Sequence, residues 1–218
     1  ENTIMGGLAA DALTTGGSNV ALGYVALTTD TVGSKSVAIG FRSLGAQNYG
    51  TATDSFNTAV GYDSGASVTT GVYNTLVGAL AGDAITDADF NVAVGQQALT
   101  ANQLGSSSVA IGTSALQNQN PATAASMLNV AVGHDAGAAI TTGIQNTFIG
   151  GLSGDATDDG AENTAVGYAS LSNGNCGNGN TTVGHASLFV CTGAGNTALG
   201  ASAGSSVSSG GNNLALGK

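Results

Sequence analysis

Residues 57–61 of this 218-residue chain read NTAVG, and the same five letters return at residues 163–167. Close variants occur throughout the chain, and each of them ends in Gly. Between the first of these glycines, Gly6, and the last, Gly217, nine of the twelve successive steps are 17 residues long, two are 21 and one is 16. The sequence is therefore an array of about thirteen coils, and a fixed period of this kind indicates a solenoid or a related repeat architecture.

A longer period lies over the short one. Residues 61–84 match residues 133–156, which lie 72 residues later, and the two 21-residue steps are also 72 residues apart. We divide the chain into blocks at residues 2–73, 74–145 and 146–212, with a fourth block starting at residue 213. The whole chain is then one repeat segment. Because the pattern stops inside a block and the first residue is not Met, we expect the segment to be excised from a longer fibre protein.

Each coil can be numbered from its first residue, Asn or Ser, as position 1. Positions 2 to 4 are mostly Thr or Val, Ala and an aliphatic residue, position 5 is always Gly, and position 8 is always Ala or Ser. Three β-formers closed by Gly are typical of a short strand followed by a corner. Such a strand is stable only when strands of neighbouring coils pair with it at about 4.8 Å. The predicted fold is all-β, a parallel β-solenoid (β-roll) of about thirteen 17-residue coils, with a length of roughly 60 Å.

Two positions are predicted to hold the coils together. Stacked Asn amides at position 1 can hydrogen-bond from coil to coil. Gly at position 5 supplies a corner that needs a positive φ or a close backbone approach. The predicted ladder residues are Asn57, Asn74, Asn91, Asn129, Asn146 and Asn163, with Gly61, Gly78, Gly95, Gly133, Gly150 and Gly167.

Position 3 is predicted to face other copies of the chain. Side chains alternate along a strand, so positions 2 and 4 point one way and position 3 points the other way. A thin coil can bury only one side, and a long apolar stripe left in water would aggregate. Position 3 is mostly Ala, but Ile4, Leu76 and Phe148 are large, and each lies in a coil with a small residue at position 9, as in a packed contact. We expect several copies to pack side by side through these three residues; the alternative is an exposed face lined by Ala.

The composition excludes several classes of function. Three Lys and Arg stand against 13 Asp and Glu, which gives a net charge of −10. The chain therefore lacks the basic surface that nucleic-acid binding or attachment to an anionic membrane requires. No apolar run is long enough to span a bilayer, and no GxSxG, P-loop, HExxH or CxxC motif is present. We expect neither catalytic activity nor a cofactor.

The two cysteines, Cys176 and Cys191, fall at nearly the same phase of adjacent coils. Adjacent coils place Cα atoms within the range of a disulfide. We predict a disulfide between them, which would indicate an oxidising, extracellular setting. Two free buried thiols are the alternative.

Acidic residues gather in loops at equivalent places of two successive blocks. Oxygen ligands in a flexible loop could bind Ca²⁺, although the nonapeptide motif of calcium-binding β-rolls is absent. The alternative is a solvated acidic rim. The candidate ligands are Asp83, Asp87, Asp89, Asp155, Asp158 and Asp159.

Rings recur at position 6 of the coils. Because His134 and His185 share this position but lie three coils apart, they are too distant to chelate one ion. Rings at a coil corner are the simplest interpretation, and an exposed strip that contacts sugar or protein is the functional one. The other rings are Tyr24, Phe41, Tyr62 and Tyr168.

The repeats resemble those of known fibres. The sequence SVAIG at Ser36 and Ser108, followed by Ser or Ala three residues after the Gly, resembles the head repeats of trimeric autotransporter adhesins. The form NTAVGYASL at residues 163–171 is similar to repeats of bacteriophage tail fibres and long bacterial surface fibres. The resemblance implies three chains, each a left-handed parallel β-roll, packed about a three-fold axis. It also implies a location on a bacterial cell surface or a virion.

The predicted function is a structural and adhesive segment of an extracellular homo-oligomeric fibre on a bacterial surface. The segment would hold or form an attachment surface for a cell-surface or glycan receptor, without contacting nucleic acid or a membrane. The shaft of a bacteriophage tail fibre is the alternative. An ice-binding solenoid is less consistent with the sequence, because three Thr pairs share a phase but intervening coils break the row. These pairs are Thr14 and Thr15, Thr69 and Thr70, and Thr141 and Thr142. A polysaccharide-degrading enzyme would need a carboxylate pair in a groove.

Overall fold

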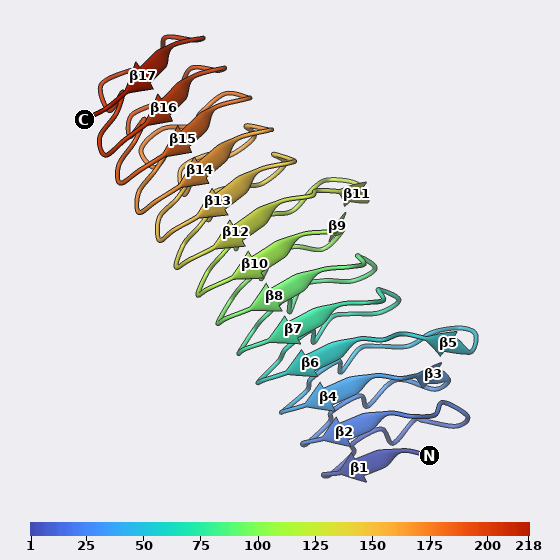
Figure 1. Cartoon of the computed structure of the whole chain (residues 1–218). Helices are drawn as coiled ribbons and strands as arrows, with labels where there is room; N and C mark the ends of the chain where they lie inside the picture. Colours follow the sequence, from blue (N-terminus) through green and yellow to red (C-terminus); the bar gives the residue numbers. More distant parts are fainter.

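The chain forms a parallel β-solenoid, as predicted. The computed structural model describes residues 1–218, has no helix, and pairs thirteen three-residue strands in one parallel sheet. Figure 1 shows the coils climbing one another along a single axis, with one strand of the sheet in each coil. The strands of this long sheet are β1 (Thr3–Met5), β2 (Val20–Leu22), β4 (Val37–Ile39), β6 (Thr58–Val60), β7 (Thr75–Val77), β8 (Val92–Val94), β10 (Val109–Ile111), β12 (Val130–Val132), β13 (Thr147–Ile149), β14 (Thr164–Val166), β15 (Thr181–Val183), β16 (Thr197–Leu199) and β17 (Leu214–Leu216).

Equivalent positions of the repeat stay in register along the whole sheet. Ala59 pairs with Leu76 across a 17-residue step, and Ala38 pairs with Ala59 across a 21-residue step. The four extra residues of the longer step therefore leave the sheet undisturbed. They bulge from the rod instead, where they add a second strand pair.

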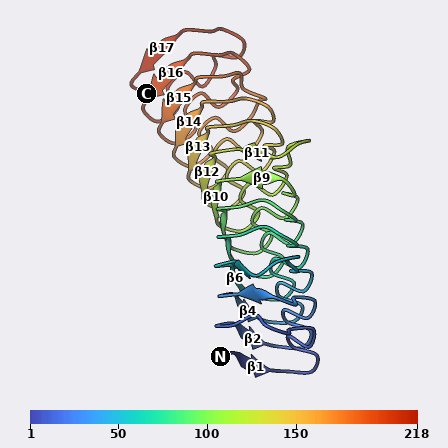
Figure 2. The same cartoon turned by 90° about the vertical axis from the view of Figure 1, so that its right-hand side faces the viewer.

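Two small parallel sheets form at these bulges and were not predicted. One pairs β3 (Gly33–Ser34) with β5 (Thr53–Asp54), and the other pairs β9 (Gly105–Ser106) with β11 (Ala125–Ser126). Figure 1 places both pairs at the side of the rod, away from the long sheet, and Figure 2 shows β9 and β11 at the side of the rod. Each bulge thus projects laterally from the same part of successive blocks.

The predicted Asn ladder is confirmed, but these amides bond to backbone groups and not only to one another. The Asn57 Oδ1 atom accepts a hydrogen bond of 2.9 Å from the backbone N–H of Asn74, and Asn57 Nδ2 donates at 2.7 Å to the carbonyl oxygen of Gly71. Each fully buried amide thus joins two coils through the backbone rather than through stacking alone, and satisfies buried backbone groups that water cannot reach. The same bond to the backbone of the next coil is made by Asn57, Asn74, Asn91, Asn129, Asn146 and Asn163.

The predicted role of Gly at position 5 is confirmed on both counts. At Gly78 φ is +133°, and a Cβ atom would lie 2.6 Å from the carbonyl oxygen of Gly95 in the next coil. A side chain at this corner would therefore be strained and would also push two coils apart. The six ladder glycines Gly61, Gly78, Gly95, Gly133, Gly150 and Gly167 all have φ between +130° and +142°.

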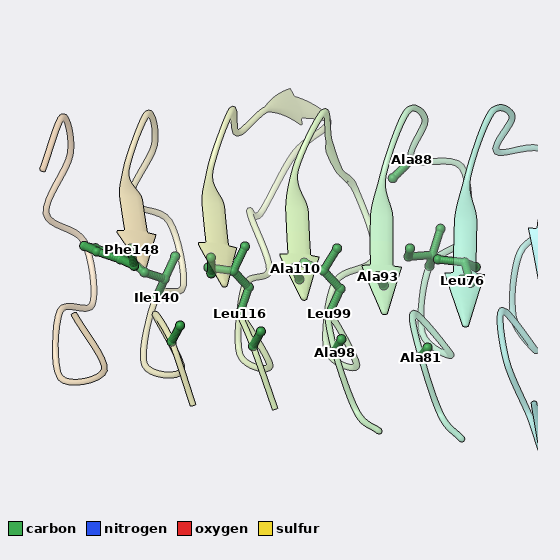
Figure 3. Packing of buried hydrophobic residues seen from close by; sticks show 14 of the residues in the cluster. Leu76, Ala81, Ala88, Ala93, Ala98, Leu99, Ala110, Leu116, Ile140 and Phe148 are labelled. Atoms are coloured by element: carbon green, nitrogen blue, oxygen red, sulfur yellow. The ribbon is translucent and has the colours of Figure 1, made fainter. Parts of the chain in front are cut away.

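The hydrophobic core is a single narrow column, which is filled in two alternative ways. Some coils place Leu at position 9 and a polar residue at position 12, such as Leu99 with Asn102. Others place Gly at position 9 and an aliphatic residue at position 12, such as Gly82 with Ile85, and a large residue at position 3 fills the remaining space. Figure 3 shows this column, with the Leu76 and Phe148 side chains extending into it between neighbouring coils.

The predicted inter-chain role of Ile4, Leu76 and Phe148 is wrong. Leu76 and Phe148 are fully buried within the single chain, and Ile4 lies in the same inward column, paired in register with Ala21. The expected contact of large with small residues does exist, because a Cβ on Gly82 would lie 2.8 Å from Leu76. The alternation was correct but the sides were reversed: position 3 points into the coil and positions 2 and 4 point outward.

Candidate functional site: the outward face of the long sheet

The outward face of the long sheet consists of positions 2 and 4 of the thirteen strands, and we call it the strand face. Along β6, Thr58 and Val60 are partly exposed, whereas Ala59 between them is buried. Position 2 is Thr, Val or Leu and position 4 is aliphatic or Met, so no charged residue lies on this face. Since the strands pair in register, the strand face is a straight, uncharged and largely apolar stripe along the rod.

A column of stacked rings borders the start of three strands. Phe56, Tyr73 and Phe90 each lie two residues before a strand, namely β6, β7 and β8. Successive ring centroids are 5.2 and 5.0 Å apart, with interplanar angles of 12° and 7°. We call these three residues the leading column. This column was not predicted, although an aromatic residue immediately before Asn in three successive coils is a visible signal.

A second column borders the end of neighbouring strands. Tyr24, Phe41 and Tyr62 each lie two residues after a strand, and their ring centroids are 6.0 and 5.2 Å apart. We call these residues the trailing column. They belong to the position-6 rings identified in the sequence, and they lie exposed at the coil corner. At the same position, His185 stacks on Tyr168 with a centroid distance of 5.6 Å, while His134 lies beside Asp135.

A buried polar cluster supports the first bulge. Gln47 Nε2 donates to Asp30 Oδ2 at 2.7 Å, and Asn57 Nδ2 donates to Gln47 Oε1 at 3.0 Å. The Tyr49 hydroxyl donates to the carbonyl oxygen of Gly71 at 2.8 Å, and burial raises the pKa of Tyr49 well above its usual range. The cluster is closed to solvent, so we assign it to holding the bulged coil in register.

The aspartates considered as calcium ligands are not brought together as a metal site. Asp83 accepts a hydrogen bond from the Thr100 hydroxyl, and Asp89 accepts one from the backbone N–H of Val72. Nowhere do three His, Cys, Asp or Glu side chains gather closely enough to hold a metal ion. The carboxylates instead act singly, mostly as acceptors between coils. This finding covers Asp83, Asp87, Asp89, Asp155, Asp158 and Asp159.

Asp155 makes a testable contribution to stability. Burial raises its pKa, against a hydrogen bond from Ser172, and one carboxylate oxygen, Oδ1, has no partner. A carboxyl group with a raised pKa in the folded state contributes stability below its unfolded pKa and loses that contribution as pH rises through the folded pKa. We therefore expect Asp155→Asn to raise the melting temperature at pH 7, and the gain to shrink as pH falls toward 4.

Thermal unfolding followed by circular dichroism at several pH values tests this expectation. Asp83→Asn is the matched control, because Asp83 is the equivalent residue one block earlier and its Oδ1 is satisfied by Thr100. A gain at pH 7 that is equal in both variants, or one that does not depend on pH, would contradict the assignment to Asp155.

The predicted disulfide is absent, because Cys176 and Cys191 are both free and fully buried. The Cys176 thiol donates a hydrogen bond of 2.9 Å to the carbonyl oxygen of Cys191. The hydrogen bond with Cys191 and the burial of the thiol both raise the pKa of Cys176. The prediction that the two cysteines lie at equivalent positions of adjacent coils was correct. Their side chains are small, buried core groups, however, and do not form a disulfide.

The thiols give a direct experimental test. We expect the folded chain to react slowly with a thiol-alkylating reagent and the denatured chain to add two labels, because both sulfurs are buried and inaccessible to the reagent. Mass spectrometry after alkylation measures the number of labels. A chain purified without reductant that takes up no label when denatured, and that gains two labels after reduction, would show that the disulfide forms.

The first residue of each Thr pair considered for ice binding is engaged between coils. The Thr14 hydroxyl donates to the carbonyl oxygen of Thr31 at 2.8 Å, and the Thr69 hydroxyl donates to that of Thr86 at 3.1 Å. The Thr141 hydroxyl donates to Asp158. These hydroxyls therefore fasten neighbouring coils. The second residue of each pair, Thr15, Thr70 and Thr142, is exposed, but the intervening coils have no Thr at this position.

The comparisons with known proteins identify no relative. No family model matches the chain, and no curated protein or solved structure matches it either. The resemblance to adhesin heads and fibre repeats therefore stays a prediction, and the strand face with its two ring columns is the feature from which a function can be argued.

Proposed function

We propose that the chain is a rigid structural and adhesive segment of an extracellular homo-oligomeric fibre on a bacterial surface. The observation that supports this function is the strand face, an uncharged and largely apolar stripe that runs the length of the rod. Large exposed apolar patches on soluble proteins mark sites of association. Depletion of charged residues is typical of the core of a protein interface.

Another copy of the chain is the partner that fits this stripe. A second rod has the same spacing between coils, so its side chains can interdigitate with those of the first along the full length, which is roughly 60 Å. Three copies around one axis, the number that the adhesin resemblance implies, would shield the face completely. The proposed fibre then holds an attachment surface for a cell-surface or glycan receptor, and we propose no catalytic role and no cofactor.

Measurement of the native mass tests the proposal. We expect sedimentation equilibrium and native mass spectrometry to give a multiple of the 20.8 kDa chain mass, three-fold in the preferred case, and electron microscopy to show short rods. Val94→Asp places a charge on the strand face and should yield single chains. Gln103→Asp is the control on an exposed loop of the same coil. An unsubstituted chain that stays monomeric at high concentration would overturn the proposal.

The shaft of a bacteriophage tail fibre is the second candidate, and the free cysteines favour it. Free thiols are typical of proteins that fold in a reducing compartment, as a virion protein does inside the infected cell. Immunogold labelling with antibodies to residues 1–218 distinguishes the two settings. Labelled virions would support the tail fibre, and labelled intact cells would support the surface fibre.

A further inference from the structure

The leading column carries rings where the backbone would be relaxed with Gly. Phe56, Tyr73 and Phe90 have φ of 51°, 59° and 59°, which is left-handed backbone that bulky residues rarely adopt. The equivalent residues of later coils include Gly179 and Gly195. Residues held in such strained conformations persist where the surrounding structure or a function requires them. Folding of a coil therefore does not itself require a ring here.

The rings also lie on the same side of the chain as the strand face. From Phe56 to Val60 the residues alternate between exposed or partly exposed and fully buried: Phe56, Thr58 and Val60 point outward, and Asn57 and Ala59 point inward. The leading column is therefore continuous with positions 2 and 4, and the trailing column borders the other end of the strands. The leading column borders β6 to β8 and the trailing column borders β2, β4 and β6, so the outward surface gains a ring column on one side over these coils and on both sides at β6.

The exposed area of this region is large enough for a specific contact. The six rings of the two columns are between 40% and 57% exposed, which leaves roughly 600 Å² of aromatic surface in solvent. A standard protein interface buries about 800 Å² on each partner, so the rings and the strand face between them suffice. Aromatic residues are also enriched in such interfaces.

Charge at the border of the region is already neutralised within the chain. The Lys35 ammonium lies 5.0 Å from the centroid of the Phe56 ring and 2.7 Å from Asp54 Oδ2, and it closes one end of the leading column. One block later, the residues equivalent to the leading column are Leu128, Gln145 and Glu162. An antiparallel neighbour overlapping all thirteen strands would bring polar and charged residues of this later block toward the rings, whereas a parallel neighbour in register would bring ring against ring.

We infer that the surface bordered by the two ring columns anchors the contact between copies, and that the copies lie parallel and in register. The inference rests on the proposed homo-oligomeric fibre and names the part of the strand face on which it depends. The remaining strand face continues the contact along the rod with smaller side chains.

Substitution by Asn separates this role from folding, because Asn tolerates left-handed backbone and occurs at the equivalent position as Asn212. The test variant is Phe56→Asn/Tyr73→Asn/Phe90→Asn. The matched control is Leu128→Asn/Gln145→Asn/Glu162→Asn, which changes the same position of the coil one block later. We expect the test variant to dissociate to the 20.8 kDa chain at concentrations at least tenfold above those at which the control remains assembled.

A cysteine variant tests the orientation of the copies. Val77 lies on the strand face in β7, next to β6, the strand that both ring columns border. In a parallel, in-register assembly the Val77 residues of different copies meet. We expect Val77→Cys to form a cross-linked dimer under oxidising conditions, visible on a non-reducing gel and absent from the unsubstituted chain.

Each other result has a distinct meaning. A test variant that stays assembled like the control, or equal dissociation of both variants, overturns the anchor while leaving the fibre proposal intact. Absence of the cross-link in an assembled variant overturns the parallel register. A monomeric unsubstituted chain overturns the fibre proposal and this inference together.

Discussion

Gly78→Ala is expected to destabilise the chain by about 3 kcal/mol or more, because it combines backbone strain with a steric clash between coils. The added methyl group would lie 2.6 Å from the carbonyl oxygen of Gly95, on a residue whose φ is +133°. Relief of the clash requires two coils to separate, which lengthens the hydrogen bonds between β7 and β8. The resulting loss is largest in the middle of the rod, where both neighbouring coils are present.

Urea denaturation followed by circular dichroism measures this loss of unfolding free energy. Gly50→Ala is the matched control, since a Cβ on Gly50 meets nothing within 4 Å. The control should stay within about 0.5 kcal/mol of the unsubstituted chain. An Ala at residue 78 that is tolerated as well as one at residue 50 would contradict the role of this glycine column.

The core column at Phe148 gives the second large effect. Phe148 is fully buried, and a Cβ on Gly137 would lie 2.8 Å from its ring. A Cβ on Gly154 would clash with the same ring. Phe148→Ala leaves this space empty, and truncation of a buried Phe is expected to cost about 3–5 kcal/mol. Gly154→Leu alone should also destabilise the chain, because its side chain would compete with Phe148 for the same space.

The double variant is expected to recover much of the lost stability. Ala at position 3 with Leu at position 9 is the combination of the next coil, Ala165 with Leu171, where both residues are fully buried. A double-mutant cycle in urea denaturation measures the coupling between the two sites. If the losses of unfolding free energy in the two single variants simply add in the double variant, the two ways of packing the core are not interchangeable.

The repeat itself was predictable because it depends on local backbone geometry that only a few residue types satisfy. Gly78 cannot be replaced without strain, and Asn74 donates within its own coil and accepts from the next coil at one fixed phase. Both residues therefore recur in the coils and reveal the period. The alternation of side chains at residues 75–77 was also predictable from the pleat of a strand. These three features were enough to define the solenoid and its number of coils.

The inward side of the strand was not predictable from alternation alone. Leu76 and Val77 are both aliphatic, and a two-residue period does not say which of them points into the coil. Asn74 was the deciding signal. Its polar side chain hydrogen-bonds the backbone of two coils and must therefore point inward, and Leu76 at position 3 lies on the same side of the strand. Reading that signal would have placed Leu76 in the core and Val77 outside.

Left-handed backbone at bulky residues was also beyond the sequence pattern. Leu99 and Tyr73 have φ of 53° and 59°, although neither residue type favours such values. The coil imposes them through packing and hydrogen bonds from its neighbours, which no local pattern reports. The same limit applies to Cys176 and Cys191, because a shared phase brings two sulfurs near each other without fixing whether they bond.

The arrangement of the core restricts how such a rod can change in length. The space beside Gly65 is filled by Leu76 of the following coil, which a Cβ on Gly65 would approach to 2.7 Å. Loss of that one coil would leave a void, whereas gain or loss of four coils together would return every coil to its present neighbours. We therefore expect duplication within the gene to occur in units of four coils, which changes the length of the rod in increments of roughly 19 Å.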